Sequence, residues 1–201
     1  MGVYNGVATK KYYLLDLTAS DYEPDYKQTL VSTVRSVVAE GDSVLEIGSG
    51  YGVCTVWLAR TVGEEGDVTS YEAGDKQVAA TKEAIQLNSN ILEEDLTERT
   101  AVEHALVGEG NAVYGPSGAK IVNAEELPSC DVLVTDCEGA ELDILPAMDV
   151  RPRTLVIETH PDFGAGTPEL SSLLEDYGYE CRKEYVSETP EGPKHILVGD
   201  R

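Results

Sequence analysis

The stretch from residue 44 to residue 60 constrains the fold of this chain more than any other. Residues 44–47 form a short apolar run interrupted only by Glu46, glycines follow at positions 48, 50 and 52, and an amphipathic run occupies 53–60. The short run bounded by glycine predicts a buried strand, and the apolar residues at helical spacing predict a helix. Glycines allow a turn with unusual φ and let a ligand approach the backbone beside the free N–H groups of the helix. The stretch therefore predicts a strand, a ligand-binding turn and a helix.

Strand-like and helix-like runs alternate along the rest of the chain, which is typical of a parallel sheet. Together with 44–47, the strand-like runs lie at 68–71, 101–106, 132–135 and 155–158. Two further β-rich runs, 179–186 and 195–198, flank a turn and predict an antiparallel hairpin. We therefore expect an α/β fold: a Rossmann-like, seven-stranded, mostly parallel sheet with helices on both faces and a C-terminal antiparallel hairpin.

Two predicted helices have recognisable ends. Asp75 is expected to be the N-cap of the helix that follows the second strand. In the last helix, Thr167 is expected as the cap, Pro168 suits the first turn, and Gly178 fits the position just past the end. These signals make 167–177 the most clearly delimited helix.

The first forty residues differ from the rest in being rich in tyrosine. Their one periodic segment places Leu30, Val34, Val37 and Val38 on one helical face. We expect residues 1–40 to form a helical extension or lid, and residues 41–201 to form the main domain.

Charge limits the partners and the environment of the chain. Its 37 Asp and Glu residues against 15 Lys and Arg give a formal net charge of −22, spread along the whole sequence. Dispersed carboxylates favour a surface adapted to high salt, where repulsion is screened within a few ångströms; an ordinary acidic protein is the alternative. Because the phosphate backbone of a nucleic acid would be repelled, a small-molecule substrate is favoured.

Cysteine usage and hydropathy indicate the compartment. Cys54, Cys130, Cys137 and Cys181 form no Cys-x-x-Cys pair, which favours reduced thiols over a disulfide or zinc site. No apolar stretch has the length of a signal peptide or a membrane span. We therefore expect a halophilic cytoplasm as the location, and no membrane association.

The spacing of the glycines distinguishes between two kinds of ligand. A dinucleotide site has the pattern Gly-x-Gly-x-x-Gly, whereas the third glycine comes one residue earlier here. Glu46 would repel a pyrophosphate but attract the ammonium of a methionine moiety, directly or through water. Glu72 ends the next strand, where a carboxylate can accept hydrogen bonds from both ribose hydroxyls. The pattern favours S-adenosylmethionine; a solvated strand end at Glu72 and a ligand-free turn are the alternatives.

These residues resemble motifs I and II of class I S-adenosylmethionine-dependent methyltransferases, and the resemblance covers roughly residues 40 to 200. The segments 131–145, 155–160 and 176–179 are similar to those of the FkbM family, which usually has Asp and a Gly-Ala-Asn-x-Gly loop where this chain has Glu46 and Gly-Ser-Gly-Tyr-Gly. The resemblance implies O-methylation of a small-molecule or sugar hydroxyl. It implies cofactor contacts from Glu46, Gly48, Ser49, Gly50, Tyr51, Gly52, Glu72, Ala73 and Asp136.

Acids and a histidine follow the fourth and fifth predicted strands. Because the C-terminal ends of parallel strands converge on the binding crevice, Asp136, Glu158 and His160 are our candidate catalytic residues, with Glu138 beside them. Methyl transfer needs an in-line nucleophile, and a hydroxyl acceptor benefits from a base. As alternatives, Asp136 or Glu138 caps the helix beginning near Ala140, and His160 merely shapes the loop before proline. No resident metal is expected, although these carboxylates offer a site for Mg²⁺.

Two other functions compete with a methyltransferase. A NAD-dependent Rossmann oxidoreductase is one, and a cofactor-binding module without catalysis is the other. The spacing of Tyr179 and Lys183 matches a pair found in some dehydrogenases, but that pair requires a helix. Since the segment is predicted as a strand, residues four apart lie too far from one another to act together.

Overall fold

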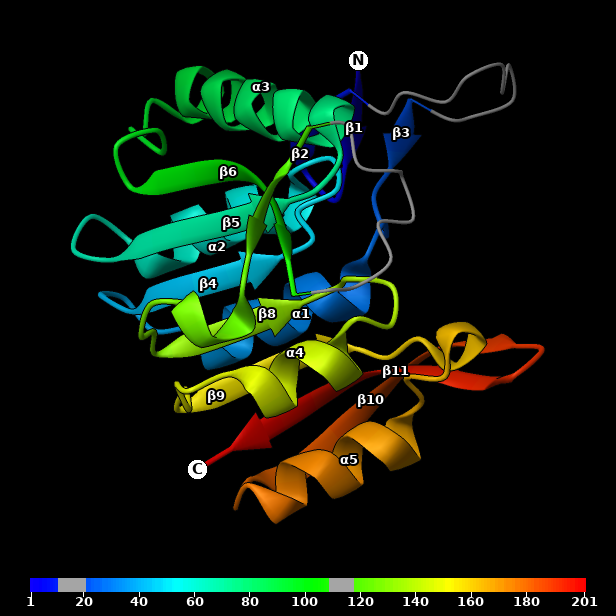
Figure 1. Ribbon diagram of the computed structural model, residues 1–201. Helices are drawn as coiled ribbons and strands as arrows, with labels where there is room; N and C mark the ends of the chain where they lie inside the picture. The colour runs from blue at the N-terminus through cyan, green and yellow to red at the C-terminus, as the bar shows by residue number, and fades with distance from the viewer. Residues whose placement is uncertain (11–20, 109–117) are drawn as a thin grey trace.

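The computed structural model describes residues 1–10, 21–108 and 118–201, and a mixed eight-stranded sheet forms its centre (Figure 1). The strand order is β10-β11-β9-β8-β4-β5-β6-β7, parallel from β9 to β7 and antiparallel at β11 and β10. The strands are β4 (Ser43–Ile47), β5 (Asp67–Glu72), β6 (Thr100–Val107), β7 (Lys120–Val122), β8 (Val132–Thr135), β9 (Thr154–Glu158), β10 (Glu180–Thr189) and β11 (Gly192–Asp200).

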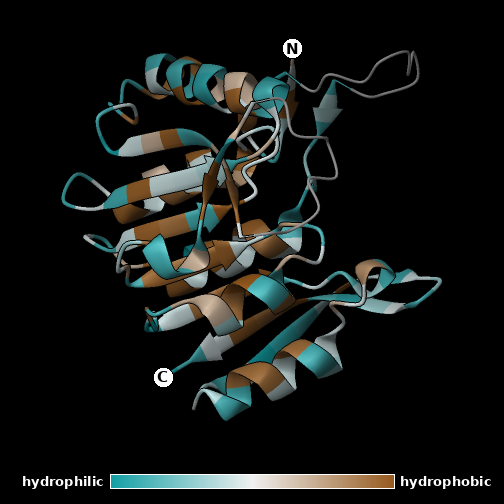
Figure 2. Ribbon diagram, viewed as in Figure 1, coloured by the Kyte–Doolittle hydropathy of each residue, from teal (hydrophilic) through white to brown (hydrophobic). Residues whose placement is uncertain are grey.

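Helices cover both faces of this sheet. On one face lie α1 (Gln28–Val37), α2 (Val53–Val62) and α3 (Asp75–Leu92); on the other lie α4 (Glu141–Ala147) and α5 (Thr167–Asp176). Short 3₁₀ turns occupy Ala124–Glu126 and Pro161–Phe163. Alternate residues of β4 point to opposite faces: Val44 belongs to the apolar cluster on the side of α1 to α3, and Leu45 belongs to the cluster on the side of α4 and α5. Figure 2 shows the resulting apolar centre, with hydrophobic residues concentrated in the middle strands.

The expected α/β architecture is confirmed, with one strand more than the seven predicted. The added strand is β7, whose three residues pair in parallel with the end of β6. Three residues are too few to show a period of two in the sequence. The C-terminal hairpin is present, and β10 and β11 extend further toward its turn than the sequence predicts.

The N-terminal region contains strands as well as the predicted helix. β1 (Gly2–Tyr4), β2 (Val7–Thr9) and β3 (Tyr22–Glu23) form a small sheet of their own. Its first turn is Asn5-Gly6, and both residues have positive φ, as tight hairpins require. Tyr4 and Val7 belong to the same apolar cluster as α1, so this sheet packs directly on the main domain.

Two predicted helix caps are displaced by one residue. Gly74 and Gly166 are the N-caps of α3 and α5, so Asp75 and Thr167 are the first helical residues instead. The Thr167 hydroxyl is hydrogen-bonded to His195 Nδ1 at 2.8 Å, which withdraws it from the helix end. Gly178 has φ +82 just past α5, as predicted. None of the helices in the described residues combines the length and the apolar character that crossing a membrane requires.

Candidate active site

The glycine loop between β4 and α2 adopts the conformation that its sequence predicts. Gly48, Gly50 and Gly52 have φ values of +93, +54 and +80. A Cβ on Gly48 would clash with the carbonyl of Asp136 at the end of β8, so the loop lies against the neighbouring strand. A Cβ on Gly50 would meet nothing within 4 Å. The loop therefore leaves space beside its own backbone at Gly50.

Glu72 closes the wall of this space at the end of β5. One of its carboxylate oxygens accepts a hydrogen bond from Gly50 N at 2.9 Å, and the other accepts one from Gly74 N at 2.8 Å. Burial raises the pKa of this carboxyl above its ordinary value, and the backbone N–H groups oppose the effect. Glu72 thus ties the glycine loop to the next strand end, where the sequence places it.

Glu46 lies beneath the loop and does not line the cavities. Its Oε2 accepts hydrogen bonds from Thr55 Oγ1 at 2.6 Å and Ser70 Oγ at 2.7 Å, whereas Oε1 has no hydrogen-bond partner among the described residues. The side chain is 1% exposed, and burial raises its pKa. Glu46 points toward α2 because its neighbours Leu45 and Ile47 occupy the opposite face of β4. Glu46 therefore lies under the loop, and its side chain is outside the walls of both cavities described below.

Two adjoining cavities open beside the loop. The first is largely apolar, with Ala105, Val107 and Ile144 in its wall. The second is larger and more polar, with Lys27, Glu158 and Lys194 in its wall. Residues common to both walls are Gly48, Glu72, Asp136 and Glu138. The shared walls make the two cavities one continuous site.

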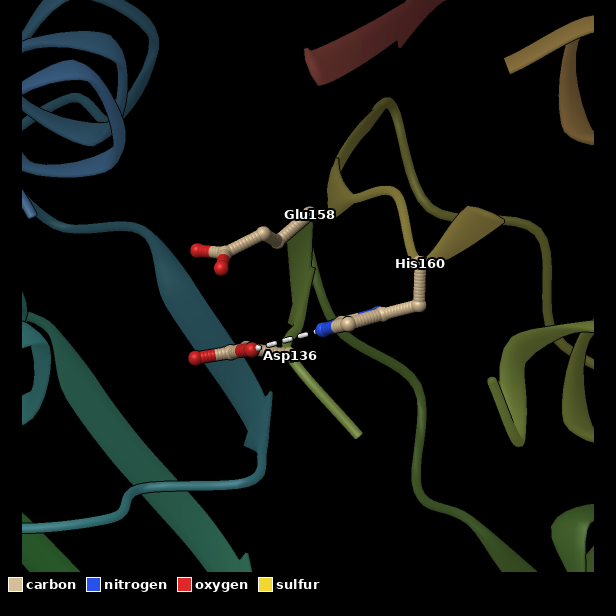
Figure 3. Close-up of side chains that lie close together, drawn as sticks. All are labelled: Asp136, Glu158 and His160. Carbon is tan, nitrogen blue, oxygen red and sulfur yellow. Dashed lines mark ion pairs between the residues drawn. The ribbon is translucent and has the colours of Figure 1, made fainter. Parts of the chain in front are cut away.

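The three predicted catalytic residues come together at the ends of β8 and β9 (Figure 3). His160 Nε2 lies 3.3 Å from Asp136 Oδ1, and one donor atom from each of Asp136, Glu158 and His160 falls within 4.8 Å of the others. Asp136 and Glu158 line the polar cavity. His160 is 3% exposed and lies behind Asp136, outside the cavity lining. The sequence thus predicts the cluster. The structure places Asp136 and Glu158 at the cavity wall and His160 behind them.

Two lysines in the cluster are absent from the sequence prediction. Lys27, the residue before α1, places its ammonium against Asp136 and 3.6 Å from Glu158 Oε2, and Lys194 Nζ lies 2.5 Å from Glu158 Oε1. Burial alone would raise the pKa of Glu158, but the two ammonium groups outweigh it and hold the pKa below its usual value. No local motif marks either lysine, because each reaches the site from a distant part of the chain.

Glu141 is a further residue of this cluster that the sequence analysis did not assign. It is fully buried, and its Oε1 accepts a hydrogen bond from Cys137 N at 3.1 Å and lies 3.4 Å from His160 Nδ1. Burial would raise its pKa, but the His160 ring beside it lowers the pKa overall. The only signal in the sequence was its place in the segment similar to the FkbM family.

The helix-capping alternative for the acids after β8 is wrong. The N-cap of α4 is Ala140, and no side chain makes a capping hydrogen bond there. Glu138 has φ +53 and turns its carboxylate toward His160, at 3.8 Å from Nε2. Asp136 and Glu138 therefore face the cluster.

Comparison with protein families gives one partial match. Residues 19–116 match the family model of protein-L-isoaspartate(D-aspartate) O-methyltransferase. The match spans just under half of the 201-residue chain. Comparison with curated protein sequences gives no match.

Solved structures resemble the whole chain. Precorrin-6y C5,15-methyltransferase from Geobacter metallireducens has a TM-score of 0.59 at 14% identity, over 98% of this chain and 96% of its own. A SAM-dependent methyltransferase from Aquifex aeolicus has a TM-score of 0.53 at 19% identity, over 89% and 94%. The O-methyltransferase TomG from Streptomyces achromogenes, involved in tomaymycin synthesis and solved in complex with SAM, has a TM-score of 0.52 at 15% identity, over 93% and 82%. The chain thus has the α/β fold of SAM-dependent methyltransferases.

Proposed function

We propose that this protein is a SAM-dependent methyltransferase that methylates an oxygen of a small molecule, such as a sugar hydroxyl. The observation that carries the proposal is the continuous site running from the glycine loop, past Glu72, to Asp136 and Glu158. Such a site can hold a nucleoside-containing cofactor at one end and an acceptor at the other. The solved structures with the same fold are methyltransferases, which supports methyl transfer as the reaction class. One of them, TomG, is an O-methyltransferase.

The residues on the loop side fit the cofactor. Glu72 and Ala73 would hold the ribose, the apolar cavity would hold the base, and residues 48–51 would hold the amino-acid end. Gly52 lies against α3, outside both cavity walls, and would support the loop from behind. The open space at Gly50 supports this assignment, because any side chain there would enter the site. When bound, the sulfonium supplies an electrophilic methyl group.

The residues on the other side suit a hydroxyl acceptor. Asp136 and Glu158 face the polar cavity, where a carboxylate can accept the hydrogen bond of the hydroxyl and take its proton as the oxygen attacks. Lys27 and Lys194 favour the charged form of Glu158. His160 lies behind Asp136, so we assign it a positioning role through that carboxylate in place of the direct base predicted from the sequence.

Calorimetric titration with S-adenosylhomocysteine tests the cofactor. We expect saturable binding of S-adenosylhomocysteine and none of NAD(H). Binding of NAD(H) alone would overturn the proposal in favour of an oxidoreductase, which the loop spacing and the fold relatives do not favour. Bound cofactor without turnover on any acceptor hydroxyl would indicate the non-catalytic module.

We further propose that residues 1–40 act as a lid on a catalytic domain of residues 41–201. Tyr26 and Lys27 support this assignment, since both lie in the wall of the polar cavity. A subfamily near FkbM is supported by the segment from Asp136 to Glu141, whose acids gather around His160.

The charge supports a proposal about the cellular setting. A net charge of −22 spread over 201 residues suits the cytoplasm of a halophilic organism. Cys54, Cys130, Cys137 and Cys181 are all free, in keeping with a reducing compartment.

A further inference from the structure

The ring of His160 is buried among carboxylates. It is 3% exposed, and neither ring nitrogen has a hydrogen-bond partner among the described residues. Nε2 points toward the carboxylates of Asp136 and Glu138, at 3.3 and 3.8 Å. Nε2 thus faces carboxylates without a hydrogen bond of good geometry, and it can bind a ligand that lies among them.

The other ring nitrogen fixes how His160 can act. Nδ1 faces Glu141 Oε1 at 3.4 Å, so the proton of a neutral ring belongs on Nδ1, where Glu141 can accept it. The lone pair of Nε2 is then directed at Asp136. A carboxylate that orients a histidine in this way is typical of metal sites, and it accounts for a glutamate that is fully buried.

The donor atoms have nearly the spacing that one ion demands. One atom each from Asp136, Glu158 and His160 lies within 4.8 Å of the others (Figure 3). Two donors bound to one ion at about 2.2 Å each lie at most about 4.4 Å apart. Adjacent donors on one ion lie closer than this limit, so the three side chains would draw together around a bound ion.

The local charge attracts a cation. Four carboxylates and two ammonium groups surround the ring, so carboxylates exceed ammonium groups by two. The carboxylates belong to Asp136, Glu138, Glu141 and Glu158, and the ammonium groups to Lys27 and Lys194. Lys27 contacts Asp136 and approaches Glu158, so its ammonium lies where a cation bridging these two carboxylates would lie.

We propose that Asp136, Glu158 and His160 bind a divalent transition-metal ion such as Mn²⁺, and that Lys27 competes with it for the same position. A ligand set of two carboxylates and one imidazole suits Mn²⁺ better than Mg²⁺, because imidazole favours transition metals. The role of the ion rests on the proposed function: at the acceptor end of the site it would lower the pKa of a bound hydroxyl.

Mn²⁺ titration of the full-length protein in molar KCl, followed by electron paramagnetic resonance, tests the site. Molar KCl suppresses binding to surface carboxylates. We expect one site per chain, with weaker binding of Mg²⁺, and a loss of affinity of roughly tenfold or more in His160→Gln and Asp136→Asn. Glu125→Gln combined with Asp143→Asn, which removes two acids from a separate cavity, is the control and should leave binding unchanged.

The Lys27→Met variant distinguishes the loss of a metal ligand from a general loss of structure. Removing the competing ammonium should raise Mn²⁺ affinity roughly tenfold, which a misfolded variant would not do. Absence of a Mn²⁺ site, unchanged affinity in both ligand variants, or equal affinity for Mg²⁺ would overturn the proposal. S-adenosylhomocysteine titrated into the same samples shows whether only the metal site fails or the proposed function fails with it.

Discussion

Gly50 tests the cofactor site at the scale of a single residue. Leucine at this position would project into space that no protein atom occupies within 4 Å. We expect Gly50→Leu to weaken S-adenosylhomocysteine binding by roughly tenfold or more, a loss of at least about 1.4 kcal/mol of binding free energy. Isothermal titration calorimetry measures the change.

Gly178→Leu is the matched control for this variant. Gly178 also has positive φ and open space around its missing Cβ, but it lies past the end of α5. Both substitutions therefore carry similar backbone strain, of about 1–2 kcal/mol, and only one enters the site. Equal loss of affinity in the two variants would mean that strain, and not the filled space, weakens binding.

At the same scale, the sequence predicts local residues of the site better than distant ones. The glycines and Glu72 could be identified because a strand, a turn and a helix follow one another along the chain. Asp136 and Glu158 could be identified because parallel strands end at one edge of a sheet. Lys27 and Lys194 could not, since their approach to Glu158 depends on how α1 and β11 pack.

Asn88 joins the N-terminal sheet to α3 and tests the packing of these elements. Its buried amide donates to Ala8 O at 2.9 Å, and its Oδ1 accepts from Ala8 N at 3.2 Å. We expect Asn88→Ala to lower the free energy of unfolding by about 2 kcal/mol, because both backbone groups of Ala8 lose their partner. Urea denaturation measures the loss.

Asn90→Ala provides the comparison on the same helix. Asn90 is exposed, so its replacement should change the unfolding free energy by no more than about 0.5 kcal/mol. If Asn88→Ala were equally mild, the contact between β2 and α3 would contribute little to stability.

The elements that could be predicted are those with several buried residues in succession. β4, β8 and β9 are apolar on both faces because helices cover both sides of the sheet, and their sequence pattern is therefore strong. β1, β2, β3 and β7 have three residues or fewer, so no periodicity develops. The Asn5-Gly6 turn was the one local signal of the first hairpin.

The charge of the whole molecule makes its stability depend on salt. A chain with 37 acidic and 15 basic residues repels itself at low ionic strength, where the screening length is about 10 Å at 0.1 M salt and shrinks to about 3 Å at 1 M. We expect the protein to lose structure in dilute buffer and to regain it in molar KCl, as followed by circular dichroism. Sucrose at the same osmolarity is the control, because it favours compact states without screening charge. Full stability at low salt would show that these carboxylates are tolerated without screening, and the halophilic assignment would then be wrong.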